Sequence, residues 1–240
     1  MDIGGIRIEF LGHSGFMISF LVCDLDGNNC VGKKMLIDPY GISKDIEKVD
    51  YVLITHGHFD HCSLADIKKV VKPGTIMLVT PDAQSKIAKL EGVEVHVVVP
   101  GDEFSVGNMK IEAISAYNTN KFRNAEKRQV FHSKNEGFVG YVIKAGNTII
   151  YHSGDSDIIP EMQKLSGYGK HGNNFICLLP VSGTYVMTPD EAAEAASLLN
   201  PDLAIPMHYG AGVIGDLKDA KLFVKLCEEK GINAKILEKI

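Results

Sequence analysis

The sequence predicts an α/β protein in which helices cover the outer faces of sheets. Short apolar runs with a period of two residues are typical of strands, and several segments that open with a capping residue are typical of helices. The two kinds of segment alternate through most of the 240 residues, which favours layered packing. A chain of this length can bury a large core. We therefore expect one domain, residues 1–240, with two related halves at 1–116 and 136–240.

Strands in the first half are expected where apolar residues alternate with polar ones or form short buried runs. The predicted strands lie at 6–10, 16–20, 35–37, 51–54, 75–79, 93–99 and 110–115. The segment 24–34 contains Gly27-Asn28-Asn29 and is typical of a turn region.

The second half again contains alternating strands and helices, and a segment without regular periodicity separates it from the first half. Residues 117–135 have little apolar periodicity, so we expect a long joining loop, and loops of that length are usually functional or disordered. A hairpin is predicted from 138–144 and 148–151 around Ala145-Gly146-Asn147. Further strands are expected at 175–179, 203–205 and 234–237.

Helices are predicted from the residues at their ends. Ser63 is a capping residue, and Thr80-Pro81 places a proline at the first helical position. The run 188–191 is a capping box, and Gly231 is a helix stop. The predicted helices span 63–71, 81–90, 188–199 and 216–230.

Composition narrows the class of protein. The net charge of −5 disfavours a protein whose whole surface binds nucleic acid. No apolar stretch has the length of a membrane span, and the N-terminus lacks the layout of a signal peptide. We expect a cytoplasmic protein without a membrane partner, and homo-oligomerisation stays open. An odd number of cysteines with no C-x-x-C pair predicts reduced thiols; they are Cys23, Cys30, Cys62, Cys177 and Cys227.

Three apolar runs each end in a residue that can bind a metal. Residues 52–55 lead into His56, 148–151 lead into His152-Ser153-Gly154-Asp155, and 203–207 lead into His208. The carboxyl ends of buried strands are where α/β sheets build their sites, so we expect these side chains to meet.

The first of these ligands opens a dense cluster. His56 and His58 are two residues apart, so in an extended segment they point to the same side. Asp60 and His61 follow where the chain turns into a helix, which can direct them at a neighbouring ion. Imidazole and carboxylate together suit zinc, manganese or iron.

The cluster also carries a family resemblance. His56-Gly57-His58-Phe59-Asp60-His61 resembles the H-x-H-x-D-H signature of the metallo-β-lactamase superfamily. Other segments stand in the same order as in the branch that includes ascorbate-6-phosphate lactonases. These segments are Phe10-Leu11-Gly12-His13-Ser14, Leu36-Ile37-Asp38-Pro39, His152-Ser153-Gly154-Asp155, Pro189-Asp190-Glu191-Ala192-Ala193 and Pro206-Met207-His208-Tyr209.

The resemblance implies a four-layer αβ/βα sandwich of two related halves. It implies two divalent metal ions, Zn or Mn with Fe also suitable, at one edge between the sheets. The implied ligands are His56 and His58 for the first ion, Asp60, His61 and His208 for the second, and Asp155 as the bridge between them.

One position departs from the family pattern. The family places a third histidine for the first ion just after a mid-chain strand, where this sequence has Ala116-Tyr117-Asn118. Asn118 is a poor zinc ligand and a fair one for harder ions. His132, in the following loop, is the alternative ligand. If neither binds, the first site is weak and the enzyme works with one tightly held ion.

Residues near the ligands receive supporting roles. Asp38 resembles a family aspartate and is expected to orient a ligand histidine, the alternative being an Asp-Pro turn residue. His13 is expected to contact the substrate or donate a proton, or else to be a structural histidine. Asp60 is expected to steer the nucleophile. Asp157 competes with Asp155 for the bridge, but only Asp155 follows a glycine as in the family.

The remaining polar candidates receive simpler interpretations. His152 is expected in the core or behind a ligand, His96 and His171 are expected to be structural, and Cys62 is expected to be small and buried. The mid-chain loop has an excess of cations. They are expected either to attract a phosphate or carboxylate group of a substrate or to be solvated without a binding role. These cations are Lys121, Arg123, Lys127, Arg128 and Lys134.

Three functions follow from this site. The first is hydrolysis of an anionic small-molecule ester, lactone or phosphoester by a metal-bound hydroxide. The second is a nuclease or phosphodiesterase of the same fold, disfavoured by the negative net charge and the lack of a long basic arm. The third is a di-iron redox protein or a non-catalytic metal-binding module.

Overall fold

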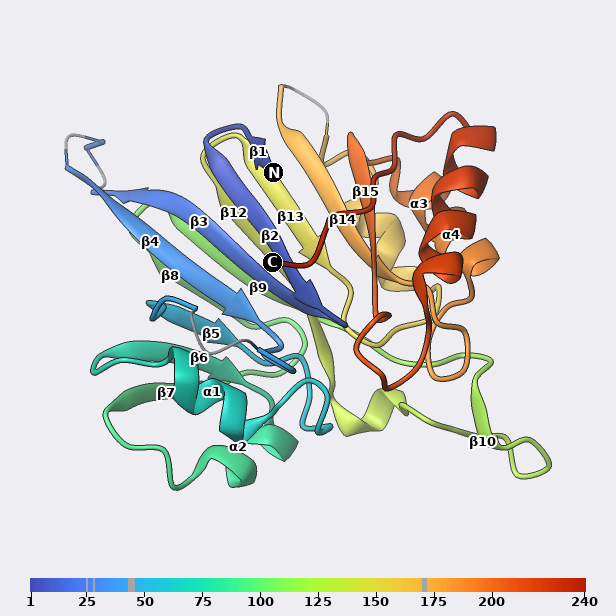
Figure 1. Ribbon diagram of the computed structural model, residues 1–240, viewed down its shortest axis with the longest axis horizontal. Helices are drawn as coiled ribbons and strands as arrows, with labels where there is room; N and C mark the ends of the chain where they lie inside the picture. The colour runs from blue at the N-terminus through green and yellow to red at the C-terminus, as the bar shows by residue number, and fades with distance from the viewer. Residues whose placement is uncertain (25, 28, 43–45, 170–171) are drawn as a thin grey trace.

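Two β-sheets face each other and carry helices on their outer faces (Figure 1). The structure is a computed structural model and describes residues 1–24, 26–27, 29–42, 46–169 and 172–240. The layers run from helices α1 and α2 through the first sheet and the second sheet to helices α3 and α4. This is the predicted four-layer sandwich.

The first sheet has the order β1-β2-β3-β4-β5-β6-β7. Its first strands pair in antiparallel fashion and β4 to β7 pair in parallel. The strands are β1 (Asp2–Ile3), β2 (Ile6–Gly12), β3 (Gly15–Cys23), β4 (Cys30–Ile37), β5 (Tyr51–Leu53), β6 (Thr75–Val79) and β7 (Val93–Val97).

The second sheet has the order β15-β14-β13-β12-β9-β8, with β13, β14 and β15 parallel. Its strands are β8 (Glu103–Val106), β9 (Met109–Ser115), β12 (Val139–Ala145), β13 (Thr148–His152), β14 (Asn174–Pro180) and β15 (Leu203–Met207). Because β8 and β9 belong to this sheet, the change of sheet falls between β7 and β8. It thus precedes the segment 117–135 in the chain.

Helices cover the outer faces near the parallel strands. Figure 1 shows α1 and α2 beside β5, β6 and β7, and α3 and α4 beside β14 and β15. The helices are α1 (Leu64–Val70), α2 (Pro81–Ile87), α3 (Pro189–Leu199), α4 (Leu217–Glu229) and two 3₁₀ turns, η1 (Lys134–Glu136) and η2 (Pro160–Leu165). The Ser63 cap and the Thr188 capping box form as predicted. Helix α2 ends before Leu90, which closes a turn onto Ile87.

The central strands separate two cores. On β4, Met35 and Ile37 point into the core between the sheets, whereas Leu36 points into the core under α1 and α2. Strand β5 divides in the same way, with Leu53 on the inner side and Val52 on the outer. Alternate side chains of a strand lie on opposite faces, so near-continuous apolar runs are what a sheet covered on both sides requires.

Three predictions about irregular regions were wrong. Strand β4 begins at Cys30, inside the predicted turn region 24–34, because it continues its pairing with β3 to that residue. Residues 117–135 contain a short hairpin, β10 (Phe122–Asn124) with β11 (Gln129–Val130), and are not wholly loop. The predicted strand 234–237 makes one isolated bridge, from Ala234 to Ala204.

The cysteine prediction was wrong for one pair. Cys23 and Cys30 face each other across the β3–β4 hairpin and form a disulfide. The spacing of the two cysteines in the sequence did not predict this contact, because it depends on the register in which β3 pairs with β4. The other three cysteines are free and buried. Among the described residues, no helix is long and apolar enough to cross a membrane.

Candidate metal centre

Histidine and carboxylate side chains from distant segments meet at the carboxyl ends of the parallel strands. Among the residues that the structure describes, their possible ligand atoms form three groups, each with all atoms within 4.8 Å of one another. The groups are His56, His58 and His132; His13, Asp60, His61 and His208; and His56, His61 and Asp155. Every residue for which the sequence predicted a metal contact is present in a group except the two alternatives Asn118 and Asp157.

The first group presents three imidazoles to one point. His56 Nε2 lies 3.1 Å from His58 Nδ1, and His132 Nε2 lies 3.4 Å from the same atom. His56 and His132 are buried, at 0% and 2% exposure. The loop after β11 thus folds back and fills the gap that the sequence left open.

Asn118 supports His132 from behind and does not join the group. Its side-chain oxygen accepts a hydrogen bond from the backbone N–H of His132 at 2.9 Å, and its amide donates to the Tyr185 carbonyl at 2.9 Å. Asp157, the alternative bridging residue, accepts backbone N–H bonds from Thr119 and Asn120. Both side chains hold the loop that delivers His132.

The second group combines one carboxylate with three imidazoles. Asp60 Oδ2 lies 2.9 Å from His13 Nε2 and 3.8 Å from His61 Nε2. The rings of His13 and His208 have centroids 4.1 Å apart. His13, predicted as a substrate contact or proton donor, therefore lies among the candidate ligands.

Asp155 lies between the two groups. Its Oδ1 is 3.3 Å from His61 Nε2 and its Oδ2 is 3.2 Å from His208 Nε2. The same Oδ2 is 3.8 Å from both His56 Nε2 and His132 Nε2. One carboxylate that faces imidazoles of both groups has the placement that a bridging ligand needs.

Several buried atoms of this cluster lack the hydrogen bonds that burial requires. Among the described residues, His61 Nε2, His208 Nε2 and Asp155 Oδ1 have no hydrogen-bond partner. An unsatisfied buried polar atom costs about 1–3 kcal/mol. A cation bound by these lone pairs removes that cost, so the donor set fits divalent metal ions of the zinc, manganese or iron type.

The electrostatics of the cluster are consistent with a cation. Burial acts to raise the pKa of Asp155, but His208 and His61 outweigh it and hold that pKa well below the usual range. Burial acts to lower the pKa of His61, but Asp155 and Asp38 outweigh it and raise that pKa well above the ordinary value. Without metal, a proton on His61 neutralises the carboxylates; a metal ion takes the place of such protons.

Asp60 and His13 form a separate proton-holding pair. Burial acts to raise the pKa of Asp60, but the hydrogen bond with His13 prevails and the pKa falls to about 2. Burial lowers the pKa of His13 to about 4, although the same hydrogen bond opposes it. Asp60 is therefore a carboxylate beside a neutral imidazole, whose Nε2–H donates to it.

Asp38 contacts His61 and Thr55, the arrangement that its expected role in orienting a ligand histidine requires. It accepts from the Thr55 backbone N–H at 2.8 Å and from the Thr55 hydroxyl at 2.6 Å. It also lies 2.8 Å from His61 Nδ1. The Thr55 hydroxyl is in turn 3.0 Å from His56 Nδ1, so one buried carboxylate positions His61 directly and His56 through Thr55.

Ser182 orients His208 and was not found from the sequence. Its hydroxyl lies 2.7 Å from His208 Nδ1. Ser182 follows the carboxyl end of β14, the parallel strand between β13 and β15. Position at a strand end was the signal that could have identified it.

The two sheets are joined at the second group. His13 and His208 both have left-handed backbones, with φ of 55° and 63°. The His13 N–H donates to the Tyr209 carbonyl at 3.0 Å, and the His208 N–H donates to the His13 carbonyl at 2.6 Å. The β2–β3 turn and the end of β15 are thereby fixed against each other where their histidines meet.

The other singled-out residues lie outside the groups. His152 Nε2 bonds to the Ser14 carbonyl at 2.9 Å in the core, and His96 pairs with Glu94 on β7. Burial raises the pKa of the Cys62 thiol to about 11, which keeps it neutral. His171 lies outside the described residues.

A cavity of about 560 Å³ opens onto the cluster. Ligand candidates form part of its wall, and aromatic and loop residues form the rest. The lining residues outside the ligand groups are Tyr40, Phe59, Arg123, Phe131, Tyr185, Gly212 and Val213.

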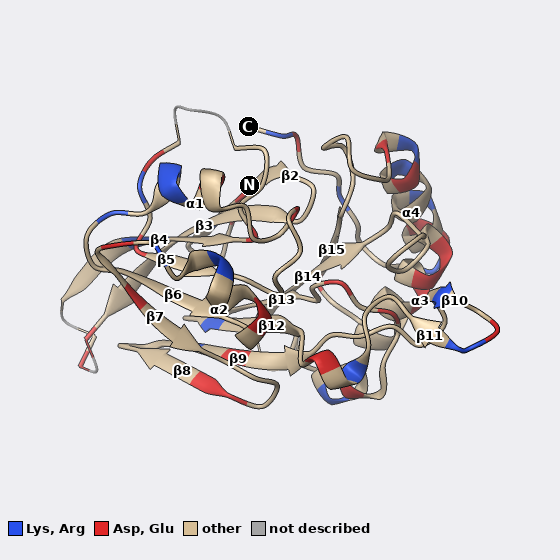
Figure 2. Ribbon diagram, turned by 90° about the horizontal axis from the view of Figure 1, so that it is seen from below, with Lys and Arg blue, Asp and Glu red and all other residues tan. Residues whose placement is uncertain are grey.

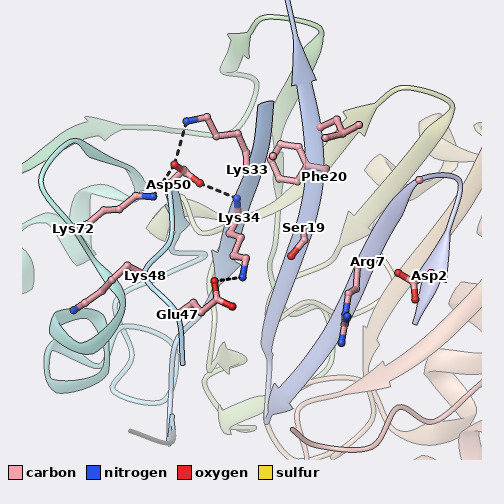
Figure 3. A pocket seen from close by; sticks show the side chains of 13 residues that line it. Asp2, Arg7, Ser19, Phe20, Lys33, Lys34, Glu47, Lys48, Asp50 and Lys72 are labelled. Atoms are coloured by element: carbon pink, nitrogen blue, oxygen red, sulfur yellow. Dashed lines mark hydrogen bonds and ion pairs between the residues drawn. The ribbon is translucent and has the colours of Figure 1, made fainter. Parts of the chain in front are cut away.

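A second hollow, of about 480 Å³, lies over strands β1 to β4 and shares no lining residue with the first (Figure 3). Five of its charged side chains are paired with one another. Asp50 forms ion pairs with Lys33 Nζ at 3.1 Å and with Lys72 Nζ at 3.0 Å, and Lys34 forms an ion pair with Glu47 at 2.5 Å. No candidate metal ligand from the three groups lines it.

Comparison with known proteins agrees with this geometry. Residues 7–208 match the Beta-lactamase superfamily domain. The chain belongs to the metallo-β-lactamase superfamily. A UPF0173 metal-dependent hydrolase from Nanoarchaeum equitans is 30% identical over 234 residues, covering 98% of this chain and 97% of that protein. The resemblance to ascorbate-6-phosphate lactonases within this superfamily stays a prediction.

Solved structures share the fold of this superfamily member. A protein of Parabacteroides distasonis assigned as a metal-dependent hydrolase superposes with a TM-score of 0.74 at 28% identity, covering 97% of this chain and 94% of that chain. CmlA of Streptomyces venezuelae, a diiron β-hydroxylase, has a TM-score of 0.67 at 17% identity, covering 99% of this chain and 53% of that chain. The chain is a metal-dependent hydrolase of the metallo-β-lactamase superfamily.

Proposed function

We propose that this chain hydrolyses an anionic small-molecule ester, lactone or phosphoester with two divalent metal ions, zinc or manganese. The observation that carries the proposal is the position of Asp155 between the two groups, with the buried Nε2 atoms of His61 and His208 lacking any hydrogen-bond partner among the described residues. His56, His58 and His132 would hold one ion and Asp60, His61 and His208 the other, with Asp155 shared. His13 is not needed in either set.

The chemistry of such a pair of ions is well defined. When bound, they would lower the pKa of a coordinated water to near neutrality and polarise the bond to be cleaved. Asp38 and Ser182 keep the ring nitrogens of His61 and His208 directed at the ions by hydrogen bonding the opposite nitrogen. His13 holds Asp60 in one orientation. We assign proton handling to the Asp60–His13 pair, which lies on the second group.

A small anionic substrate suits the surroundings better than a nucleic acid. The cavity of about 560 Å³ is the size of a small-molecule site. Two of the loop cations form ion pairs within the protein, Lys121 with Glu191 and Lys134 with Glu161, so they are not free to bind phosphates of a nucleic acid. The net charge of −5 gives little long-range attraction for a polyanion.

The test is metal analysis combined with a substrate panel. Purified protein loaded with zinc, manganese or iron is assayed against lactones, carboxylic esters and phosphoesters, and bound metal is counted by elemental analysis. We expect two ions per chain and hydrolysis of at least one anionic substrate. Asp155→Ala should reduce both the metal content and the rate of hydrolysis, whereas Asp50→Asn should reduce neither. Full turnover by chelated protein or by Asp155→Ala would refute the proposal. Two tightly held irons with no hydrolysis would instead favour redox chemistry of the kind CmlA performs.

A further inference from the structure

The hairpin β10–β11 projects from the body of the molecule beside the metal centre (Figure 2). Strand β10 carries Arg123, and strand β11 leads into Phe131. Both residues line the cavity. The next residue is His132, a member of the first ligand group. The hairpin therefore delivers one ligand to the ions and two side chains to the space in front of them.

Three described cations of this loop have no ion pair, Arg123, Lys127 and Arg128, and of these Arg123 alone lines the cavity. No described carboxylate lies within 4.0 Å of it, whereas Lys121 lies 2.6 Å from Glu191 and Lys134 lies 2.7 Å from Glu161. Its recorded contact is with the Phe131 ring, whose centroid is 5.7 Å from Cζ. A guanidinium stacked on a ring keeps its donors free for a carboxylate or phosphate.

Aromatic rings surround the rest of the cavity mouth. Phe131 and Tyr185 meet edge to face with centroids 4.7 Å apart, and Tyr40 and Phe59 meet likewise at 5.8 Å. Phe59 is 63% exposed and Tyr185 is 37% exposed. Large apolar side chains exposed around a functional cavity mark a surface that a ligand covers.

We propose that this cavity selects substrates that carry a flat apolar group with an anionic group on the far side from the bond to be cleaved. Arg123 binds the anion through its guanidinium, and Phe131 and Tyr185 receive the apolar group between that anion and the metal centre. The inference rests on the proposed function for the position of the scissile bond. It adds the arrangement of substrate groups, and it identifies the hairpin as the recognition element.

The kinetic test uses matched esters. The 4-nitrophenyl esters of phenylacetate and of 4-carboxyphenylacetate differ only in a carboxylate remote from the scissile bond. We expect the wild-type protein to prefer the carboxylated ester by roughly tenfold in kcat/KM, the size of a charge-assisted hydrogen bond. Arg123→Gln should abolish that preference, so that the two esters have nearly equal kcat/KM in the variant. Arg128→Gln removes the same charge from the same hairpin outside the cavity, and should keep the preference.

A second ester pair tests the apolar contact. 4-Nitrophenyl phenylacetate should be preferred over 4-nitrophenyl acetate, and Phe131→Leu should reduce that preference several-fold while the volume of the side chain is nearly kept. An unaltered preference in Phe131→Leu would contradict the assigned apolar contact, and an unaltered carboxylate preference in Arg123→Gln would contradict the anion site.

Equilibrium binding separates failure of this inference from failure of the proposed function. Calorimetric titration of metal-loaded protein with 4-carboxyphenylacetate and with phenylacetate needs no turnover. Tighter binding of the dianion that is lost in Arg123→Gln and kept in Arg128→Gln supports the recognition element even if no ester is hydrolysed. Equal affinity for the two ligands in the wild-type protein overturns it, even if the esters are hydrolysed well.

Discussion

The metal centre and the hollow over strands β1 to β4 both gather many charges, but they satisfy them in opposite ways. Asp155 is nearly fully buried and faces the Nε2 atoms of His61 and His208, which have no hydrogen-bond partner among the described residues. Asp50 is partly exposed, pairs with two lysine ammonium groups and accepts a hydrogen bond from the Lys34 backbone N–H. The Asp50 carboxylate is therefore satisfied within the protein, whereas Asp155 Oδ1 has no hydrogen-bond partner among the described residues.

This difference teaches that the number of charges is a poor guide to function. Exposed ion pairs contribute at most about 1 kcal/mol each and need no further explanation. Buried polar atoms without partners are costly, and they persist where a ligand satisfies them. The two hollows are of similar size, so the state of their polar atoms distinguishes them.

The largest expected effect comes from the shared carboxylate. Asp155→Ala should slow hydrolysis by at least ~10³-fold, because metal ions supply several kcal/mol of transition-state stabilisation and each 1.36 kcal/mol is a factor of ten. Elemental analysis of the variant should show fewer ions per chain. If Asp155→Ala kept its full metal content and a near-normal rate, Asp155 would be no more important for function than Asp50, and the contrast between the two regions would be wrong.

Asp38 is expected to give the next largest effect. Asparagine tolerates the left-handed backbone at this position, where φ is 45°, so Asp38→Asn isolates the loss of the carboxylate. We expect metal affinity to fall about 10–100-fold, and the unfolding free energy of chelated protein to fall by roughly 2 kcal/mol because Thr55 or His61 loses an acceptor. Metal titration and urea unfolding measure the two effects. Unchanged values would mean that the carboxylate does not orient His61.

Ser182→Ala should have a smaller effect that is confined to one ion. Loss of the hydroxyl frees His208 Nδ1 and should lower the affinity of the second ion by about tenfold. Stepwise metal titration distinguishes the two ions. Equal weakening of both would show that Ser182 acts on the whole cluster.

Asp50→Asn should have the smallest effect and a defined pH dependence. Burial acts to raise the pKa of Asp50, but hydrogen bonds from the Lys34 backbone, Lys72 and Lys33 outweigh it and lower that pKa below its ordinary value. The folded pKa is the lower one, so the stabilisation is present above about pH 4 and is lost as the pH falls through the folded value. We expect a loss of at most about 1 kcal/mol at pH 7 that vanishes in acid. Unfolding curves of both proteins at several pH values test this, and a difference that grows in acid would contradict it.

The sequence predicted the layers and most members of the candidate ligand groups because both follow from local patterns. Strands with continuous apolar runs had to be covered on both faces, and His56, Asp155 and His208 each followed such a strand. The position of Asp38 after β4 indicated its orienting role in the same way.

What the sequence left undecided depends on contacts between distant segments. The choice between Asn118 and His132 required the path of the loop, which Asp157 fixes through backbone N–H groups. The disulfide between Cys23 and Cys30 depends on the register of a hairpin, and the assignment of β8 and β9 to the second sheet depends on pairing with β12. None of these contacts has a local signature.

The hydrogen bonds between His13 and the segment His208–Tyr209 have a consequence for how the protein matures. The β2–β3 turn is made early in synthesis and the end of β15 is made late, yet each fixes the other's backbone beside the second ligand group. A nascent chain that has released only the His56–His61 cluster from the ribosome has no His208 with which to complete that group. Occupancy of the second ion would therefore report that the two ends of the polypeptide have met.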